Sequence, residues 1–266
     1  MKTMGELIRF NNLKVSFIRS GAYMNAVNGV SFHVDKGEIL CIAGESGSGK
    51  SVTAKSILQL NPPDTTLYED GEILYNGENL LAMNRKQLSR IAGSKISMIF
   101  QDPLTSLNPV YKVGQQMSAL LRLHNPGMSK SDALKRAAEL LESVEIHQPE
   151  RVLNNYPFEL SGGMRQRVMI AMAISGDPDL LIADEPTTAL DVTIQAQILK
   201  LLLDIHKRSG LSIIFITHDL SVVYQIADRV IVFNKGQIVE QGTKEEVFLN
   251  PKDDYTKKLL NSVLRI

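Results

Sequence analysis

The feature that most constrains this chain is a glycine-rich octapeptide lying between an apolar segment and an amphipathic one. Residues 44–51 read Gly-Glu-Ser-Gly-Ser-Gly-Lys-Ser, which matches the phosphate-loop pattern G-x-x-x-x-G-K-[ST]. Residues 38–43 are predicted to form a buried strand, and residues 50–60 have helical spacing up to Pro62-Pro63. Because the motif requires a strand before it and a helix after it, a chance glycine-rich turn is the less favoured interpretation.

The octapeptide is predicted to bind the phosphates of a nucleotide mainly through its backbone. Its glycines allow successive N–H groups to turn toward an anion, and the positive end of the next helix dipole adds to the attraction. Lys50 is expected to reach the β- and γ-phosphates, and the Ser51 hydroxyl is a predicted Mg²⁺ ligand. The candidate nucleotide-binding residues of this segment are Gly44, Glu45, Ser46, Gly47, Ser48, Gly49, Lys50, Ser51 and Val52.

A second candidate site lies at the end of another apolar segment. Residues 180–185 read Leu-Leu-Ile-Ala-Asp-Glu, which predicts a strand that ends in two carboxylates. Acidic residues at the carboxyl end of a parallel strand lie at the sheet edge where ligands bind. We expect Asp184 to hold Mg²⁺, through water, and Glu185 to polarise an attacking water. The alternative is a solvated acidic pair without a catalytic role.

The order of predicted elements indicates the fold class. Strand-like residues at 7–17 and 27–34 precede the octapeptide, and Asn76-Gly77 predicts a hairpin turn after a strand at 71–75. Strands and helices alternate again at the end of the chain: 180–183, 193–207, 212–216, 221–227 and 229–233. We therefore expect an α/β fold, with a mostly parallel sheet and an N-terminal antiparallel β part.

Between these two alternating regions the pattern is helical. Residues 110–123, 129–144 and 161–175 carry apolar residues at intervals of three and four, and Ser129 is a plausible N-cap. We interpret residues from about 105 to 175 as a helical subdomain inserted into a single domain that covers residues 1–266.

Composition excludes several classes of protein. Lys plus Arg equals Asp plus Glu at 29 each, so no global field attracts nucleic acid, and we expect no nucleic-acid partner. The single cysteine, Cys41, cannot form an internal disulfide and lies in a predicted buried strand. No apolar segment approaches the ~20 residues that cross a bilayer, so the chain is not expected to span a membrane by itself.

A further motif, together with the two described above, resembles the motif set of a known family. Residues 160–166 read Leu-Ser-Gly-Gly-Met-Arg-Gln, 110 positions after the phosphate loop. With residues 44–51 and 180–185, this order resembles the ATP-binding subunits of ABC transporters, from residue 7 to about 242. The resemblance implies ATP and Mg²⁺ as cofactors, and ATP hydrolysis as the activity. It also implies that Ser161, Gly162 and Gly163 contact the γ-phosphate bound to an opposite subunit.

The resemblance gives roles to residues elsewhere. Phe17 occupies the place of the aromatic residue that stacks on adenine, although it could equally belong to the core. Gln101 matches a glutamine that touches Mg²⁺ and the lytic water, and His218 matches a histidine that senses the γ-phosphate. Ala189-Leu190-Asp191 matches a loop that crosses the dimer seam, which makes Asp191 a candidate binding residue. The implied catalytic residues are Glu185, His218 and Gln101, and the implied metal ligands are Ser51, Gln101 and Asp184.

The same resemblance implies an assembly. Two such cassettes, identical or related, pair head to tail with ATP between the core of one and the signature motif of the other. The pair drives permease subunits and depends indirectly on an external substrate-binding protein. This arrangement places the chain at the cytoplasmic face of a bacterial or archaeal cell membrane. Residues near 104–113 are expected to line a groove for a permease helix.

The cargo is less constrained. Residues 101–109, 156–167 and 183–191 are similar to importers of the oligopeptide, dipeptide and nickel group. Two departures bear on peptide import: no cysteine cluster follows Cys41, and Phe158 stands where peptide members often have histidine, as nickel-type members do. Peptide import is the favoured interpretation, and import of nickel or another metal chelate is the alternative.

Other classes fit the motifs less well. DNA-maintenance ATPases share the signature motif but separate it from the phosphate loop by a long coiled coil, and residues 52–160 show no sustained heptads. Translation-associated ATPases usually carry two cassettes, and this length accommodates one. A stand-alone soluble ATP-dependent enzyme would require a second substrate pocket, which the sequence does not indicate.

Overall fold

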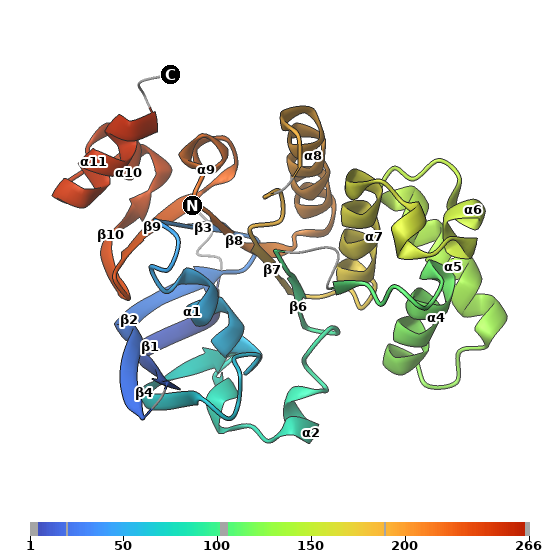
Figure 1. Cartoon of the computed structure of the whole chain (residues 1–266), viewed down its shortest axis with the longest axis horizontal. Helices are drawn as coiled ribbons and strands as arrows, with labels where there is room; N and C mark the ends of the chain where they lie inside the picture. The colour runs from blue at the N-terminus through green and yellow to red at the C-terminus, as the bar shows by residue number, and fades with distance from the viewer. Residues whose placement is uncertain (1–4, 20, 102–105, 189, 264–266) are drawn as a thin grey trace. The chain divides into compact units, whose positions relative to one another are not determined.

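The structure, a computed structural model, describes residues 5–19, 21–101, 106–188 and 190–263. It divides into two compact units, most of whose helices and strands are labelled in Figure 1. Unit 1 comprises Met1–Leu88 and Gly210–Ile266, and unit 2 comprises Ser89–Ser209. The two stretches of unit 1 are far apart in the sequence, so this unit is held together by long-range contacts.

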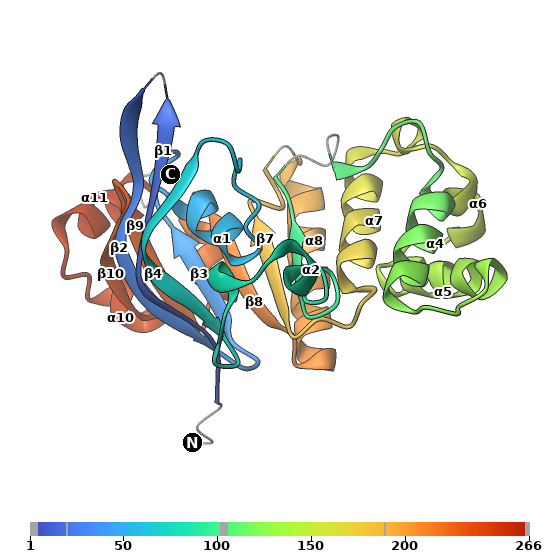
Figure 2. The same ribbon diagram turned by 90° about the horizontal axis from the view of Figure 1, so that it is seen from below.

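Unit 1 contains an antiparallel sheet of four strands in the order β2-β1-β4-β5, of which Figure 2 labels the first three. The strands are β1 (Glu6–Arg19), β2 (Ala22–Asp35), β4 (Thr66–Tyr75) and β5 (Glu78–Asn79). Phe10 and Phe32 are paired across β1 and β2, and their rings stack with centroids 4.1 Å apart. The predicted Asn76-Gly77 turn joins β4 to β5, and both residues have the positive φ of a type I′ hairpin.

A second group of strands in unit 1 surrounds β3 (Ile39–Ala43), whose five residues are all buried. β8 (Ser212–Thr217) and β9 (Arg229–Asn234) pair with β3 in parallel, and β10 (Gln237–Thr243) pairs with β9 antiparallel. Continuous apolar strands of this kind are typical of parallel sheets that are covered on both faces. Cys41 is fully buried in β3, which confirms its expected place in the core, and this burial raises the pKa of its thiol.

The helices of unit 1 follow these strands. They are α1 (Lys50–Ile57), η1 (Leu80–Ala82), α2 (Arg85–Leu88), α9 (Leu220–Ile226), α10 (Lys244–Leu249) and α11 (Asp254–Val263).

Unit 2 combines one parallel pair of strands with most of the helices between them in sequence. β6 (Ile96–Ile99) pairs in parallel with β7 (Leu180–Asp184). The helices are α4 (Val113–His124), α5 (Lys130–Ser143), α6 (Pro149–Asn154), η2 (Pro157–Glu159), α7 (Gly162–Ile174) and α8 (Val192–Ser209). The Ser129 hydroxyl accepts a hydrogen bond from Asp132 N at 3.1 Å, which confirms the predicted cap of α5.

The predicted fold class is confirmed: parallel strand pairs and helices follow an N-terminal antiparallel sheet. Sequence patterns did not predict α6, because six residues that begin with a proline are too short to show a helical period. Within the described residues, none of the helices combines the length and apolar character needed to cross a bilayer.

Candidate functional site

The phosphate loop connects the end of β3 to the start of α1, and two of its glycines admit no side chain. A Cβ at Gly44 would lie 2.3 Å from the Phe233 carbonyl oxygen, and one at Gly49 would lie 2.5 Å from that of Ala26. Both glycines also have positive φ, 146° and 104°. The Ser48 carbonyl accepts a hydrogen bond from Gly236 N at 2.9 Å, so β2, β9 and the turn after β9 fix the loop.

Lys50 places a cation inside this loop. The residue is 3% exposed, and its Nζ donates to the carbonyl oxygens of Gly44 and Glu45, each at 2.7 Å. Ser51 and Val52 follow in the first turn of α1, which contains no acidic residue. The ammonium group and the N-terminus of α1 give the loop a positive potential. The close-packed glycine backbone and this charge fit a triphosphate.

Phe17 and His218 lie in the same unit as the phosphate loop. Phe17 is half-buried on β1, opposite Met24 of β2 and Thr66 of β4. His218 is exposed and directly follows β8. The turn that carries it is fixed because Asp219 N donates to Thr217 Oγ1 at 3.0 Å and Asp219 Oδ1 caps α9 at Ser221 N.

The acidic pair lies in unit 2 at the end of β7. Asp184 is the last residue of the strand and is 2% exposed. Glu185 has a φ of 49°, a left-handed conformation that turns the chain sharply after the strand. The structure brings Gln101 to this residue: its Nε2 donates to Glu185 Oε2 at 3.1 Å.

Thr188 is a contact of Glu185 that the sequence did not predict. Its hydroxyl donates to the same Oε2 at 2.9 Å, and its backbone N donates to the Glu185 carbonyl at 3.2 Å. Two donors therefore hold one carboxylate oxygen. The sequence does contain an indication of this contact: Thr188 is a hydroxyl residue three positions after Glu185, and a tight turn brings residues at this spacing together.

The signature motif forms the start of α7. Ser161 is the N-cap, and its hydroxyl accepts from Met164 N at 3.3 Å. Ser161 and Gly162 are exposed, whereas a Cβ at Gly163 would lie 2.9 Å from Ile194 Cγ2 of α8. The arrangement presents the positive end of a helix on the surface, as an anion-binding segment requires.

Asp191 lies at the start of α8, where its Oδ1 accepts from Ile194 N at 2.9 Å. Its carboxylate thus has a local role as a helix cap. Ala189, from the same predicted loop, lies outside the described residues, as does Leu104 of the predicted groove.

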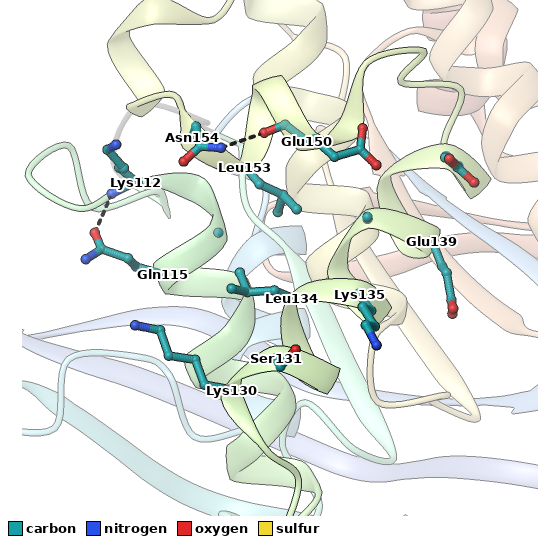
Figure 3. Close-up of a pocket in the computed structure, with 13 residues that line it drawn as sticks. Lys112, Gln115, Lys130, Ser131, Leu134, Lys135, Glu139, Glu150, Leu153 and Asn154 are labelled. Atoms are coloured by element: carbon teal, nitrogen blue, oxygen red, sulfur yellow. Dashed lines mark hydrogen bonds between the residues drawn. The ribbon is translucent and has the colours of Figure 1, made fainter.

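The other residues of the predicted groove differ in exposure. Leu107 is buried, whereas Val110 and Tyr111 are 70% and 53% exposed. A cavity of about 660 Å³ lies nearby, among α4, α5 and α6 (Figure 3). Leu134 and Leu153 form its apolar part, and charged residues surround them: Lys112, Lys130, Lys135, Glu139, Glu142 and Glu150.

The sequence of this chain is similar to those of known transport proteins. A sequence model described as ABC transporter matches residues 27–188, more than half of the chain. The "Oligopeptide transport ATP-binding protein OppD" of Bacillus subtilis (strain 168) is 54% identical over 97% of this chain and 72% of that protein. The "Dipeptide transport ATP-binding protein DppD" of Lactococcus lactis subsp. cremoris (strain MG1363) is 50% identical over 97% and 74%.

A solved structure is also similar. It is titled "Dimeric structure of a post-hydrolysis state of the ATP-binding cassette MJ0796 bound to ADP and Pi". It is 28% identical, with a TM-score of 0.79 over 90% of this chain and 99% of that chain. By its sequence match, its relatives and its motifs, the chain belongs to the ABC transporter family.

Proposed function

We propose that this chain binds and hydrolyses ATP to drive the import of peptides. The observation that carries the proposal is identity of about 50% over nearly the whole chain to proteins named for oligopeptide and dipeptide transport. The geometry of the phosphate loop supports the ATP-binding step independently. The peptide cargo rests on the relatives alone.

The residues of the phosphate loop would bind the triphosphate. Backbone N–H groups of Gly47 to Ser51 surround the phosphate oxygens, and the Lys50 ammonium offsets their negative charge. Lys50 must then exchange its bonds to the Gly44 and Glu45 carbonyls for bonds to phosphate. Phe17 provides a surface for the adenine ring.

Glu185 would polarise the attacking water. Gln101 and Thr188 donate to one of its oxygens and so fix the orientation of the carboxylate before the reaction. His218, at the end of β8, senses the γ-phosphate. Ser51, Gln101 and Asp184 supply oxygen donors of the kind that Mg²⁺ prefers, and bound Mg²⁺ neutralises charge on the phosphate oxygens.

A second cassette would complete the site. Ser161, Gly162 and Gly163 of one copy address the γ-phosphate held by the other, and the loop that ends at Asp191, the cap of α8, lies at the seam between them. The dimeric form of the MJ0796 cassette and the exposed start of α7 support this pairing. The partner cassette is a second copy or a related chain.

The cassette pair would act on permease subunits at the cytoplasmic face of the membrane, together with an external substrate-binding protein. The exposed side chains of Val110 and Tyr111 are candidates for the contact with the permease. ATP binding closes the pair and hydrolysis reopens it, so that each cycle changes the conformation of the permease.

The proposal can be tested by uptake in cells that lack this chain. Uptake of a labelled peptide should be lost and should return with the wild-type chain, but not with the Lys50→Ala variant. Uptake of a free amino acid serves as the control. Loss of nickel uptake with unchanged peptide uptake would contradict peptide import and support the metal alternative.

A further inference from the structure

The C-terminal helix of the chain contacts the phosphate loop. Tyr255 lies in the first turn of α11, and its hydroxyl accepts a hydrogen bond from Glu45 N at 3.2 Å. The two residues are 210 positions apart in sequence, and both belong to unit 1. Glu45 is the second residue of the phosphate loop.

Tyr255 is held in place by a series of local contacts. The Glu240 carboxylate of β10 accepts from Lys252 N at 2.8 Å and from Asp253 N at 3.1 Å. Asp253 in turn accepts from Tyr255 N at 2.8 Å, which caps the start of α11. Thr256, the next residue, and Leu260, one turn beyond it, are buried on one face of the helix. These hydrogen bonds and the buried helix face therefore fix the position of the Tyr255 backbone.

Glu45 links Tyr255 to Lys50, because it forms a hydrogen bond with each of them. Glu45 N donates to Tyr255, and the Glu45 carbonyl accepts from Lys50 Nζ at 2.7 Å. A second contact from the C-terminal part joins Gly236 N to Ser48 O at 2.9 Å. Thus Glu45 and Ser48 are both bonded to residues that follow β9. Burial raises the pKa of the Tyr255 phenol, so the hydroxyl is protonated near neutral pH.

We propose that Tyr255 is a positioning residue that holds Glu45 and so keeps the backbone of the phosphate loop in the conformation that receives the triphosphate. The proposal rests on the ATP binding proposed above. A loop held in its binding conformation loses less conformational entropy when the ligand arrives. Loss of one net hydrogen bond predicts nucleotide binding that is weaker by about five-fold.

The test compares two variants that each remove one phenolic hydroxyl. Tyr255→Phe keeps the ring and removes the acceptor for Glu45 N. Tyr224→Phe is the matched control: Tyr224 lies on α9, half-exposed, with its ring edge-on to Phe248 at 5.2 Å. For each full-length variant we would measure hydrogen exchange of the Glu45 amide without nucleotide, the Kd for MgATP, and KM and kcat for ATP hydrolysis.

For Tyr255→Phe we expect faster exchange at Glu45, a Kd and KM for MgATP raised about five-fold, and kcat changed less than two-fold. Tyr224→Phe should match the wild type in all four quantities. Unchanged exchange at Glu45 in Tyr255→Phe would overturn the contact, and faster exchange with an unchanged Kd would overturn its role in binding. If the wild-type chain bound no MgATP, the proposed function would fail, and the exchange comparison would still decide whether Tyr255 holds the loop.

Discussion

The phosphate loop of unit 1 and the Glu185 turn of unit 2 are built in different ways. The loop is fixed by its backbone: Gly44 and Glu45 accept from Lys50, and two glycines lie against the carbonyls of Phe233 and Ala26. The Glu185 turn is fixed by side chains, since Gln101 and Thr188 share one carboxylate oxygen. The loop requires glycines where a side chain would collide with the neighbouring backbone, whereas the turn requires polar side chains that donate hydrogen bonds. Different substitutions should therefore disrupt the two regions.

The largest effect is expected from a methyl group added at the tightest point of the loop. Gly44→Ala places Cβ 2.3 Å from the Phe233 carbonyl oxygen, and we expect a loss of about 2–4 kcal/mol in unfolding free energy and MgATP binding weaker by at least about 100-fold. Denaturant unfolding and nucleotide titration measure these quantities. Gly77→Ala, in the turn between β4 and β5, is the control, because its Cβ also meets nothing within 4 Å and it incurs only the cost of positive φ, about 1 kcal/mol. Equal losses in the two variants would show that close packing does not fix the loop.

A smaller effect is expected where a side chain, and not the backbone, fixes the site. Thr188→Val removes one of two donors to Glu185 Oε2, and we expect kcat to fall about five-fold while the Kd for MgATP stays the same. Thr188→Ser keeps the hydroxyl and should hydrolyse ATP within two-fold of the wild type. Steady-state kinetics decide the question, and a fall in kcat of the same size in both variants would exclude the hydrogen bond as the cause.

The smallest effect is expected at a local feature that belongs to neither region. Ser129→Ala removes the N-cap of α5 and should lower the unfolding free energy by about 1 kcal/mol without changing ATP hydrolysis. Ser131→Ala is the control, because Ser131 is exposed in the first turn of the same helix. This substitution should change the unfolding free energy by less than about 0.5 kcal/mol. Equal effects would show that the cap does not stabilise the helix.

Features that depend on neighbouring residues could be predicted from the sequence, and contacts between distant residues could not. The phosphate loop was recognised because its constraints follow a pattern within eight consecutive residues, and the buried strands β3 and β7 because their apolar runs are local. The contacts of Gly44 with Phe233 and of Glu45 with Tyr255 join residues about 190 and 210 positions apart, and no pattern in either segment indicates them. Strands β1 and β2 extend beyond the predicted ends because pairing continues through exposed residues such as Ile18 and Tyr23, which lack alternating burial.

The most direct test of the account is a single-turnover experiment on Glu185→Gln, with MgATP binding and cleavage followed in the same sample. The amide is isosteric with the carboxylate but is a poor base, so we expect binding at the wild-type Kd and cleavage slowed about 10³-fold. Cleavage at the wild-type rate would contradict the role of Glu185. If Glu185→Gln raised the Kd for MgATP as strongly as Lys50→Ala does, the division of roles would be wrong. In that division the phosphate loop binds the triphosphate and the Glu185 turn acts on the attacking water.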